Sequence, residues 1–158
     1  VEVDKRLAAL GTPEADQLLG TCAIAQAKLA YKLFTTSFSS PRWNDLAKLG
    51  ARVQRPLWAS TSTKNPLYPD TLYVEQLIGP LTVNTLPDPT MEAFADHGTI
   101  ERTIDADVEA AEATWEQLKK LGIDMSNVAA QLEQEGVDSF QKSFQELIAA
   151  LEQKLETL

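Results

Sequence analysis

Several kinds of residue are scarce in this chain, and each scarcity excludes a class of protein. Among 158 residues there is one cysteine, Cys22, so an internal disulfide is excluded and a reducing, cytoplasmic setting is expected. No apolar run reaches the roughly 18 residues that a membrane span needs, and no basic-then-apolar leader is recognisable. Basic residues are outnumbered, 14 Lys and Arg against 23 Asp and Glu, which argues against a nucleic-acid-binding protein.

The charge that is present is spread unevenly along the chain. Residues 41–68 carry five basic side chains and one acidic side chain, whereas residues 99–158 carry thirteen acids and five bases. We interpret the acidic part as the solvated faces of helices. The basic centre suits a small anionic ligand.

Apolar spacing and capping residues predict a mainly helical chain with one core, since 44% of the residues are hydrophobic. Thr12 followed by Pro13 predicts a cap and a long helix that runs to about Phe34. Further helices are predicted at 42–49, stopped by Gly50; at 71–78, capped by Asp70; at 90–97, closed by Gly98; at 104–118; at 127–135, before Gly136; and at 138–158, with an apolar stripe of Phe140, Phe144, Leu147, Leu151 and Leu155.

Two short segments read as strands. ARVQRPLWAS (51–60) is extended because Pro56 disfavours a helix, and LTVNTL (81–86) is rich in β-branched residues. A helix between them predicts a βαβ unit with parallel strands. A parallel sheet needs more than two strands, and the sequence begins at Val1 in the middle of a pattern. We therefore expect the C-terminal part of a larger α/β protein.

The run STSTKN, residues 60–65, directly follows the first predicted strand. Ligands of parallel α/β sheets bind at the carboxyl ends of the strands. Hydroxyl groups and backbone N–H groups can surround a phosphate, and a lysine supplies a compact cation. The run is also compatible with a solvated turn, but the basic segment around it favours a phosphate site.

The stretch RVQRPLWASTSTKNPLYPDTLYVEQLIGPLTVNTLPDPTMEAFADHG resembles the seventh and eighth strand region of transaldolases of the long-chain bacterial and plant subfamily. VEVDKRL is similar to the residues that follow that family's sixth strand. The resemblance covers about residues 1–125. It implies a (β/α)8 TIM barrel, of which this chain is the C-terminal portion, and transfer of a dihydroxyacetone unit between sugar phosphates through a lysine Schiff base, without metal or organic cofactor.

The resemblance places the substrate phosphate against Ser60, Ser62 and Lys64. Asn65 and Asn84, which end the two strands, become possible residues of the substrate pocket, although both also suit turns. The family usually has Thr-Gly-Thr-Lys where this chain has Thr61-Ser62-Thr63-Lys64. A glycine can offer a phosphate only its backbone, so a contact from the Ser62 side chain would be a difference from the family.

No catalytic residue of the family falls within this chain, because the Schiff-base lysine and the acid and base carboxylates come from earlier strands. A Schiff-base lysine must be neutral part of the time, whereas Lys64, the only lysine at a predicted strand end, is assigned to an anion. The expected partners are sugar phosphates and the missing N-terminal part of the barrel. The expected domains are 1–125, the last two strands with their helices, and 126–158, helices packing on the barrel.

Two other functions stay open at this point. One is another phosphate-binding barrel enzyme, such as a class I aldolase, with its lysine on a different strand. The other is a helical interaction module that uses the apolar stripe between Phe140 and Leu155. Single residues outside the loop are assigned structural roles: Cys22 as a small buried hydrophobe, Trp58 in barrel packing, and His97 as a cation at a helix C-terminus.

Overall fold

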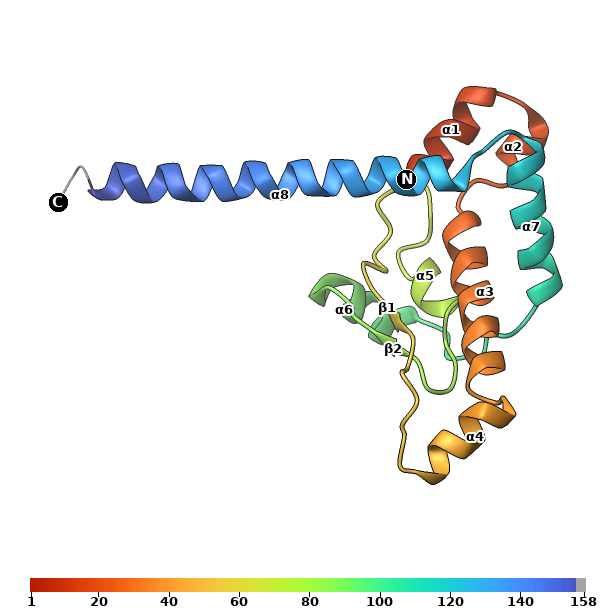
Figure 1. Cartoon of the computed structure of the whole chain (residues 1–158). Coiled ribbons are helices and arrows are strands. Elements are labelled where there is room, and N and C mark those ends of the chain that lie inside the picture. The colour runs from red at the N-terminus through yellow and green to blue at the C-terminus, as the bar shows by residue number, and fades with distance from the viewer. Residues whose placement is uncertain (156–158) are drawn as a thin grey trace. The chain divides into compact units, whose positions relative to one another are not determined.

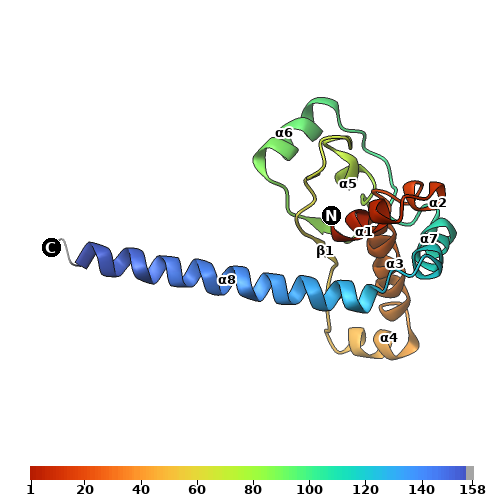
Figure 2. The same cartoon turned by 90° about the horizontal axis from the view of Figure 1, so that it is seen from above.

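The computed structural model describes residues 1–155, and the chain divides into two compact units, Val1–Leu121 and Gly122–Leu158 (Figures 1 and 2). The second unit contains α8 (Met125–Leu155). None of the helices described is both long and apolar enough to cross a membrane. In chain order the first unit contains α1 (Glu2–Leu10), α2 (Pro13–Asp16), α3 (Cys22–Ser37), α4 (Pro41–Lys48), β1 (Leu57–Trp58), α5 (Leu72–Glu75), β2 (Val83–Asn84), α6 (Asp88–His97) and α7 (Val108–Lys120).

The two strands are parallel, as the sequence predicts, and α5 lies between them in the chain. Leu57 pairs with Val83, and Trp58 pairs with Asn84. The amide of Val83 donates to the carbonyl of Pro56 at 2.9 Å, and the amide of Thr85 donates to the carbonyl of Trp58 at 3.0 Å. Each strand is only two residues long, far shorter than the predicted segments. The polar loop at 60–65 therefore starts almost directly after the paired residues.

Helices α3 and α7 lie side by side and form the main helical layer of the first unit (Figure 1). The buried Lys28 of α3 donates from Nζ to the carbonyl of Ala106 at 2.9 Å, just before α7 begins. Lys32 and Glu112 form an ion pair further along the two helices. On another side of α3, Tyr31 packs with Leu77 and Ile104 in a core cluster, and Trp58 of β1 packs against this cluster. The core thus joins α3 to the sheet.

Ile104 reaches this core from a loop and not from a helix, so the predicted start of a helix at 104 is wrong. The amides of Thr103 and Ile104 both donate to the carbonyl of Ile78 at 3.0 Å, which holds this loop against the chain after α5. A side chain at Gly79 would overlap Ile104, whose Cγ2 lies 2.0 Å from the position of a Cβ. The regular helix α7 begins only at Val108, after Asp107 in a left-handed conformation.

The predicted long helix from Pro13 to Phe34 is broken. The Thr12 hydroxyl accepts from the amide of Ala15, so the predicted cap is confirmed, but α2 ends at Asp16. Gly20 then adopts a left-handed backbone with φ of 77° before α3 begins at Cys22. A residue in the left-handed conformation cannot continue a right-handed helix. The helix is therefore interrupted at Gly20, although the apolar pattern of the sequence continues through it.

Asp70 does not cap α5, contrary to the sequence prediction. The cap position is Thr71, which makes no capping hydrogen bond with its side chain. Asp70 instead binds His97 at the last turn of α6, with 3.0 Å between Oδ1 and Nε2. The predicted stops at Gly50 and Gly98 are confirmed, because α4 ends at Lys48 and α6 ends at His97.

Helix α8 is one continuous helix of 31 residues, so the predicted interruption at Gly136 is wrong. The apolar stripe predicted on it is exposed; Phe140 and Phe144 are 81% and 63% accessible. The predicted domain of 126–158 extends over residues 156–158, which lie outside the described residues. Its boundary at 125 and its packing on a barrel stay predictions.

Candidate functional site

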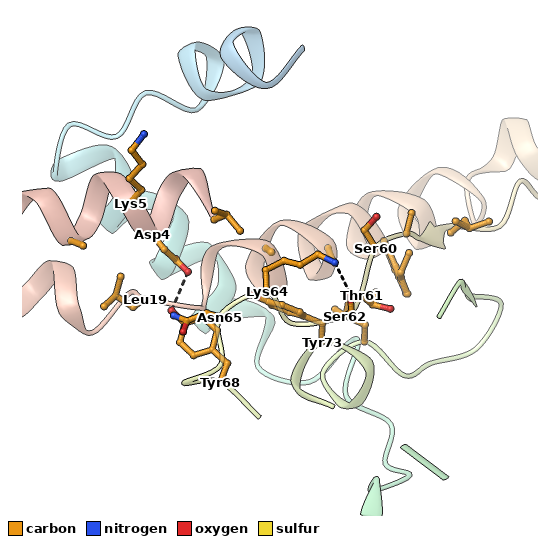
Figure 3. Close-up of a pocket in the computed structure, with 18 residues that line it drawn as sticks. Asp4, Lys5, Leu19, Ser60, Thr61, Ser62, Lys64, Asn65, Tyr68 and Tyr73 are labelled. Atoms are coloured by element: carbon orange, nitrogen blue, oxygen red, sulfur yellow. Dashed lines mark hydrogen bonds between the residues drawn. The ribbon is translucent and has the colours of Figure 1, made fainter. Parts of the chain in front are cut away.

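A cavity of about 620 Å³ lies beside the carboxyl end of β1, within the first unit (Figure 3). Its wall is built by α1, by the start of α3, by β1, by the polar loop and by α5. Ser60, Ser62, Lys64 and Asn65 all line it. Four of the five predicted site residues are therefore brought together at one cavity.

Ser60 turns the chain out of the strand. Its φ is 57°, in the left-handed region that residues other than glycine rarely occupy. Such a conformation costs on the order of 1 kcal/mol and persists only where the surroundings hold it. The turn directs the following residues along the cavity instead of continuing the strand.

Thr61 is the buried anchor of the loop, with 4% of its surface accessible. Its hydroxyl donates to Oδ1 of Asn84 at 2.8 Å, which ties the end of β1 to the end of β2. Asn84, the fifth predicted site residue, does not line the cavity. The structure thus places Asn84 behind the loop, where its amide oxygen braces Thr61.

Lys64 and Ser62 converge on each other. The Lys64 ammonium donates from Nζ to Oγ of Ser62 at 2.9 Å, as the dashed line in Figure 3 shows. Within residues 1–155 no carboxylate lies at ion-pair distance from Lys64. Ser62 accepts from the lysine and so keeps its own hydroxyl hydrogen for another acceptor. The pair can present one positive charge and one neutral donor to an anion.

The far end of the loop is held by Asn65 and Tyr68. The Asn65 side-chain oxygen accepts from the amide of Leu67 at 3.0 Å, and its carbonyl accepts from the amide of Tyr68 at 3.1 Å. The Tyr68 hydroxyl donates to Oδ2 of Asp4 in α1 at 3.0 Å (Figure 3). Burial raises the pKa of Tyr68, and the hydrogen bond to Asp4 raises it further, so the phenol stays protonated at neutral pH.

The charge at the cavity comes from few residues. Of the five bases in the segment 41–68, Lys64 alone lines it; Lys48 pairs with Asp45 on α4 at 2.9 Å, and Arg55 lines a different hollow. Asp4 and Lys5, both from α1, are the other charged residues of the wall. The basic segment of the sequence therefore does not gather at the cavity as a whole.

The rest of the wall is largely apolar and includes Leu19, Leu57 and Trp58. Trp58 packs against the core cluster and also lines this wall, whereas its predicted packing in a barrel stays a prediction. Its buried Nε1–H has no hydrogen-bond acceptor among the described residues. Small polar groups at one end of an apolar cavity are typical of a site for a small molecule.

Asp4, Tyr68 and Tyr73 are among the wall residues that reasoning from the sequence missed. Asp4 precedes the loop by more than fifty residues, and no spacing pattern connects it to Tyr68. Burial, and then the charge of Asp4, raise the pKa of Tyr73, so both tyrosines are neutral. The two aromatic residues that follow the loop, in PLYPDTLY, are the only local signal.

Other titratable residues lie away from this cavity or are inert. Cys22 is buried, as predicted, and burial with the nearby Asp4 raises the pKa of its thiol to about 11. His97 does not line the cavity and sits between Asp70 and Asp96. Within residues 1–155, no group of three or more His, Cys, Asp or Glu side chains is arranged to hold a metal ion.

Parallel strands, a connecting helix and a polar loop at the carboxyl end of the first strand define a piece of a parallel α/β protein with a small-molecule site. The chain belongs to the transaldolase/fructose-6-phosphate aldolase family, whose model matches residues 3–151. The resemblance noted in the sequence is thereby confirmed.

Individual relatives agree with this membership. The chain is 53% identical over 155 residues to a transaldolase of Parafrankia sp. (strain EAN1pec), and 51% identical over 155 residues to a transaldolase of Thermobifida fusca (strain YX). It is 49% identical over 158 residues to a protein of Streptomyces avermitilis named transaldolase 2. These alignments cover 98–99% of this chain but 42% of each relative. The chain thus spans less than half the length of the relatives that it matches.

Proposed function

We propose that this chain is the phosphate-binding, C-terminal part of a transaldolase, and that Ser60, Ser62 and Lys64 hold the phosphate of the sugar. The whole enzyme transfers a dihydroxyacetone unit between sugar phosphates in the pentose phosphate pathway, in the cytoplasm, through a lysine Schiff base, without metal or cofactor. The observation that carries the proposal is the convergence of Lys64 and Ser62 on the wall of the cavity. A lysine without a carboxylate partner, beside a free hydroxyl donor, matches what a phosphate dianion requires.

The rest of the (β/α)8 barrel belongs, in this proposal, to a preceding segment of the same protein. A sheet of two strands leaves residues such as Leu57 of β1 more than half exposed. A closed barrel needs about six further strands to fill its interior. The relatives are long enough to contain them, since this chain covers 42% of their length. The exposed stripe of α8 would then cover part of the barrel surface.

The Schiff-base lysine also belongs to the preceding segment. Two lysines line the cavity in this chain, Lys5 and Lys64. Lys5 is highly exposed on α1 and lies 3.9 Å from a carboxylate oxygen of Glu2. The buried Lys28 is committed to the carbonyl of Ala106 and does not line the cavity. None of the three has the desolvated, unpaired environment that favours a neutral amine.

The test of Lys64 is its replacement by methionine in the full-length enzyme. Loss of one charge-assisted contact should cost about 1.5–3 kcal/mol, so we expect KM for fructose 6-phosphate to rise roughly ten- to a hundredfold. The measurement is the steady-state kinetics of the variant with fructose 6-phosphate and with unphosphorylated fructose.

The matched control is Lys48→Met, which removes another exposed lysine, one of α4 that pairs with Asp45 away from the cavity. It should leave both KM values unchanged. Equal losses by Lys64→Met on the phosphorylated and the unphosphorylated sugar would contradict the assignment.

The alternative within enzymes is aldol cleavage of fructose 6-phosphate by a class I mechanism, an activity that the family description also names. We place transaldol transfer first because the three relatives above are named transaldolases. Product analysis separates the two: an aldolase releases free dihydroxyacetone without an acceptor aldehyde, whereas a transaldolase needs the acceptor for turnover.

A further inference from the structure

The loop that carries Ser62 and Lys64 is fixed at two points and is only partly buried between them. The upstream point is Thr61, buried and bound to Asn84. The downstream point is Tyr68, whose hydroxyl is bound to Asp4. The position of Lys64 relative to the cavity therefore depends on both attachments.

The downstream attachment is built from three elements. Asp4 of α1 accepts with Oδ2 from the Tyr68 hydroxyl at 3.0 Å and with Oδ1 from the amide of Gly20 at 3.1 Å. The ring of Tyr68 lies over Gly20, with Cζ 3.1 Å from the position that a Cβ there would take. Gly20 also has a φ of 77°, which other residues rarely adopt. One carboxylate thus connects α1, the turn before α3 and the end of the polar loop.

Resting on the function proposed above, we propose that Asp4 and Tyr68 are positioning residues for the phosphate group of the substrate. Their hydrogen bond fixes the end of the polar loop, so that Lys64 and Ser62 face the cavity before substrate arrives. Neither residue needs to touch the phosphate in this role. Without the bond, the loop must be ordered at the moment of binding, which lowers affinity for the phosphorylated part of the substrate.

The charge of Asp4 makes its replacement a sharp test. Asp4 lines the same cavity as Lys64, so its negative charge by itself opposes the binding of an anion. If Asp4 acted only through its charge, Asp4→Asn would lower KM for a phosphorylated sugar. If Asp4 positions the loop, the same substitution raises KM. An asparagine has one oxygen where the carboxylate has two, so it cannot accept from both the Gly20 amide and the Tyr68 hydroxyl with separate oxygens.

The experiment measures kinetics of Asp4→Asn and Tyr68→Phe in the full-length enzyme, with fructose 6-phosphate and with fructose. Tyr68→Phe keeps the ring over Gly20 and removes only the hydroxyl. We expect KM for fructose 6-phosphate to rise about five- to tenfold in each variant, as for the loss of one hydrogen bond. We expect kcat and the kinetics with fructose to stay as in the parent. The double variant should be no worse than the worse single variant, since both break the same bond.

The matched control is Tyr31→Phe, which removes another tyrosine hydroxyl that donates at 3.1 Å, in this case to the carbonyl of Pro80 and away from the cavity. It should lower the melting temperature and leave the ratio of the two KM values unchanged. The proposal would be overturned if Tyr31→Phe changed that ratio as much as Tyr68→Phe does. It would also be overturned if Tyr68→Phe raised KM equally for fructose 6-phosphate and for fructose. If Asp4→Asn does not fold, Tyr68→Phe decides alone.

Lys64→Met, measured in parallel, separates this inference from the function on which it rests. If Lys64→Met does not discriminate between the two sugars, the proposed phosphate site is wrong. If Lys64→Met discriminates and Tyr68→Phe does not, the phosphate site stands and the positioning role of Asp4 and Tyr68 is wrong.

Discussion

His97 shows how a single residue can acquire a role that its position in the sequence only partly indicates. It lies in the last turn of α6, where a cation is favoured, and its ring nitrogens lie 3.0 Å from Asp70 and 3.2 Å from Asp96. The hydrogen bond to Asp70, followed by that to Asp96, raises the pKa of His97 above its ordinary value of 6.5. The same bond lowers the pKa of Asp70 below 3.8. The pair connects the chain before α5 to the end of α6.

The pH dependence of this pair follows from the raised pKa of His97 and the lowered pKa of Asp70. The contribution of His97 to stability is complete below pH 6.5 and is lost as the pH rises through the raised pKa. The contribution of Asp70 is present above pH 3.8 and is lost as the pH falls through the lowered pKa. We predict that Asp70→Asn lowers the pKa of His97 in the full-length enzyme, measured by NMR titration with His97→Gln to identify the signal. A pKa that does not move would show that the bond to Asp70 is absent in solution.

At the residue scale, the sequence predicted the loop better than the residues that hold it. Six hydrogen-bonding residues in a row after a strand are visible in one window of the sequence. Asp4 lies 64 residues before Tyr68, and Asn84 lies 23 residues after Thr61. Nothing in a single sequence indicates which distant carboxylate or amide meets a given hydroxyl. The local pattern indicated the loop, and the family resemblance assigned Ser60, Ser62 and Lys64 within it, whereas Asp4 required the fold.

At the scale of the element, apolar periodicity predicted where the helices lie, but it did not always predict where they begin and end. The break at Gly20 was missed because the apolar pattern continues on both sides of it, and a mid-helix glycine costs only about 1 kcal/mol. The opposite error occurred at Gly136, where the helix continues and, apart from its chain neighbours and the adjacent backbone of its own helix, no atom of the described residues lies within 4 Å of an added Cβ. The two glycines look alike in sequence, and only their tertiary surroundings differ. Gly20 has Asp4 and Tyr68 beside it.

This difference predicts that Gly136→Ala raises the helicity of α8. Alanine relieves the conformational entropy cost of glycine by about 1 kcal/mol in a helix interior, and the open space around Gly136 accepts the methyl group. The measurement is circular dichroism of a peptide of residues 122–158. Ala149→Gly, further along the same helix, is the reciprocal control and should lower helicity by a similar amount. A Gly136→Ala peptide that is no more helical would contradict the continuous helix.

At the scale of the whole molecule, the parallel α/β arrangement was predicted from the sequence, whereas the barrel to which it was assigned stays a proposal. The parallel pair with its intervening helix was expected and is present, and the family membership agrees with the resemblance. The strands were predicted too long. The sequence pattern indicates which residues can adopt an extended conformation, and in a wider sheet more of them would find a pairing partner. With one neighbour only, two residues on each strand are paired.

The isolated chain should therefore be inactive. The lysines at its cavity lack the environment of a Schiff-base amine, and two strands cannot close a barrel. We predict no turnover and no covalent sugar adduct after borohydride reduction with fructose 6-phosphate, measured by mass spectrometry. Addition of the separately produced N-terminal part should restore turnover. An adduct on Lys64 of the isolated chain would contradict both this prediction and the role assigned to that lysine.

The contact between Gly20 and the ring of Tyr68 has a consequence for how such proteins diverge. A residue other than glycine at position 20 would place its Cβ 3.1 Å from the ring of Tyr68 and would have to adopt a φ of 77°, so its replacement is favoured only where the side chain at 68 shifts or shrinks. Asp4 is in turn useful to the loop only while a hydroxyl at 68 is present to donate to it. These three positions should therefore change together during evolution, and recombination between distant relatives with a crossover between Gly20 and Tyr68 should be selected against, even though each position alone looks unremarkable in the sequence.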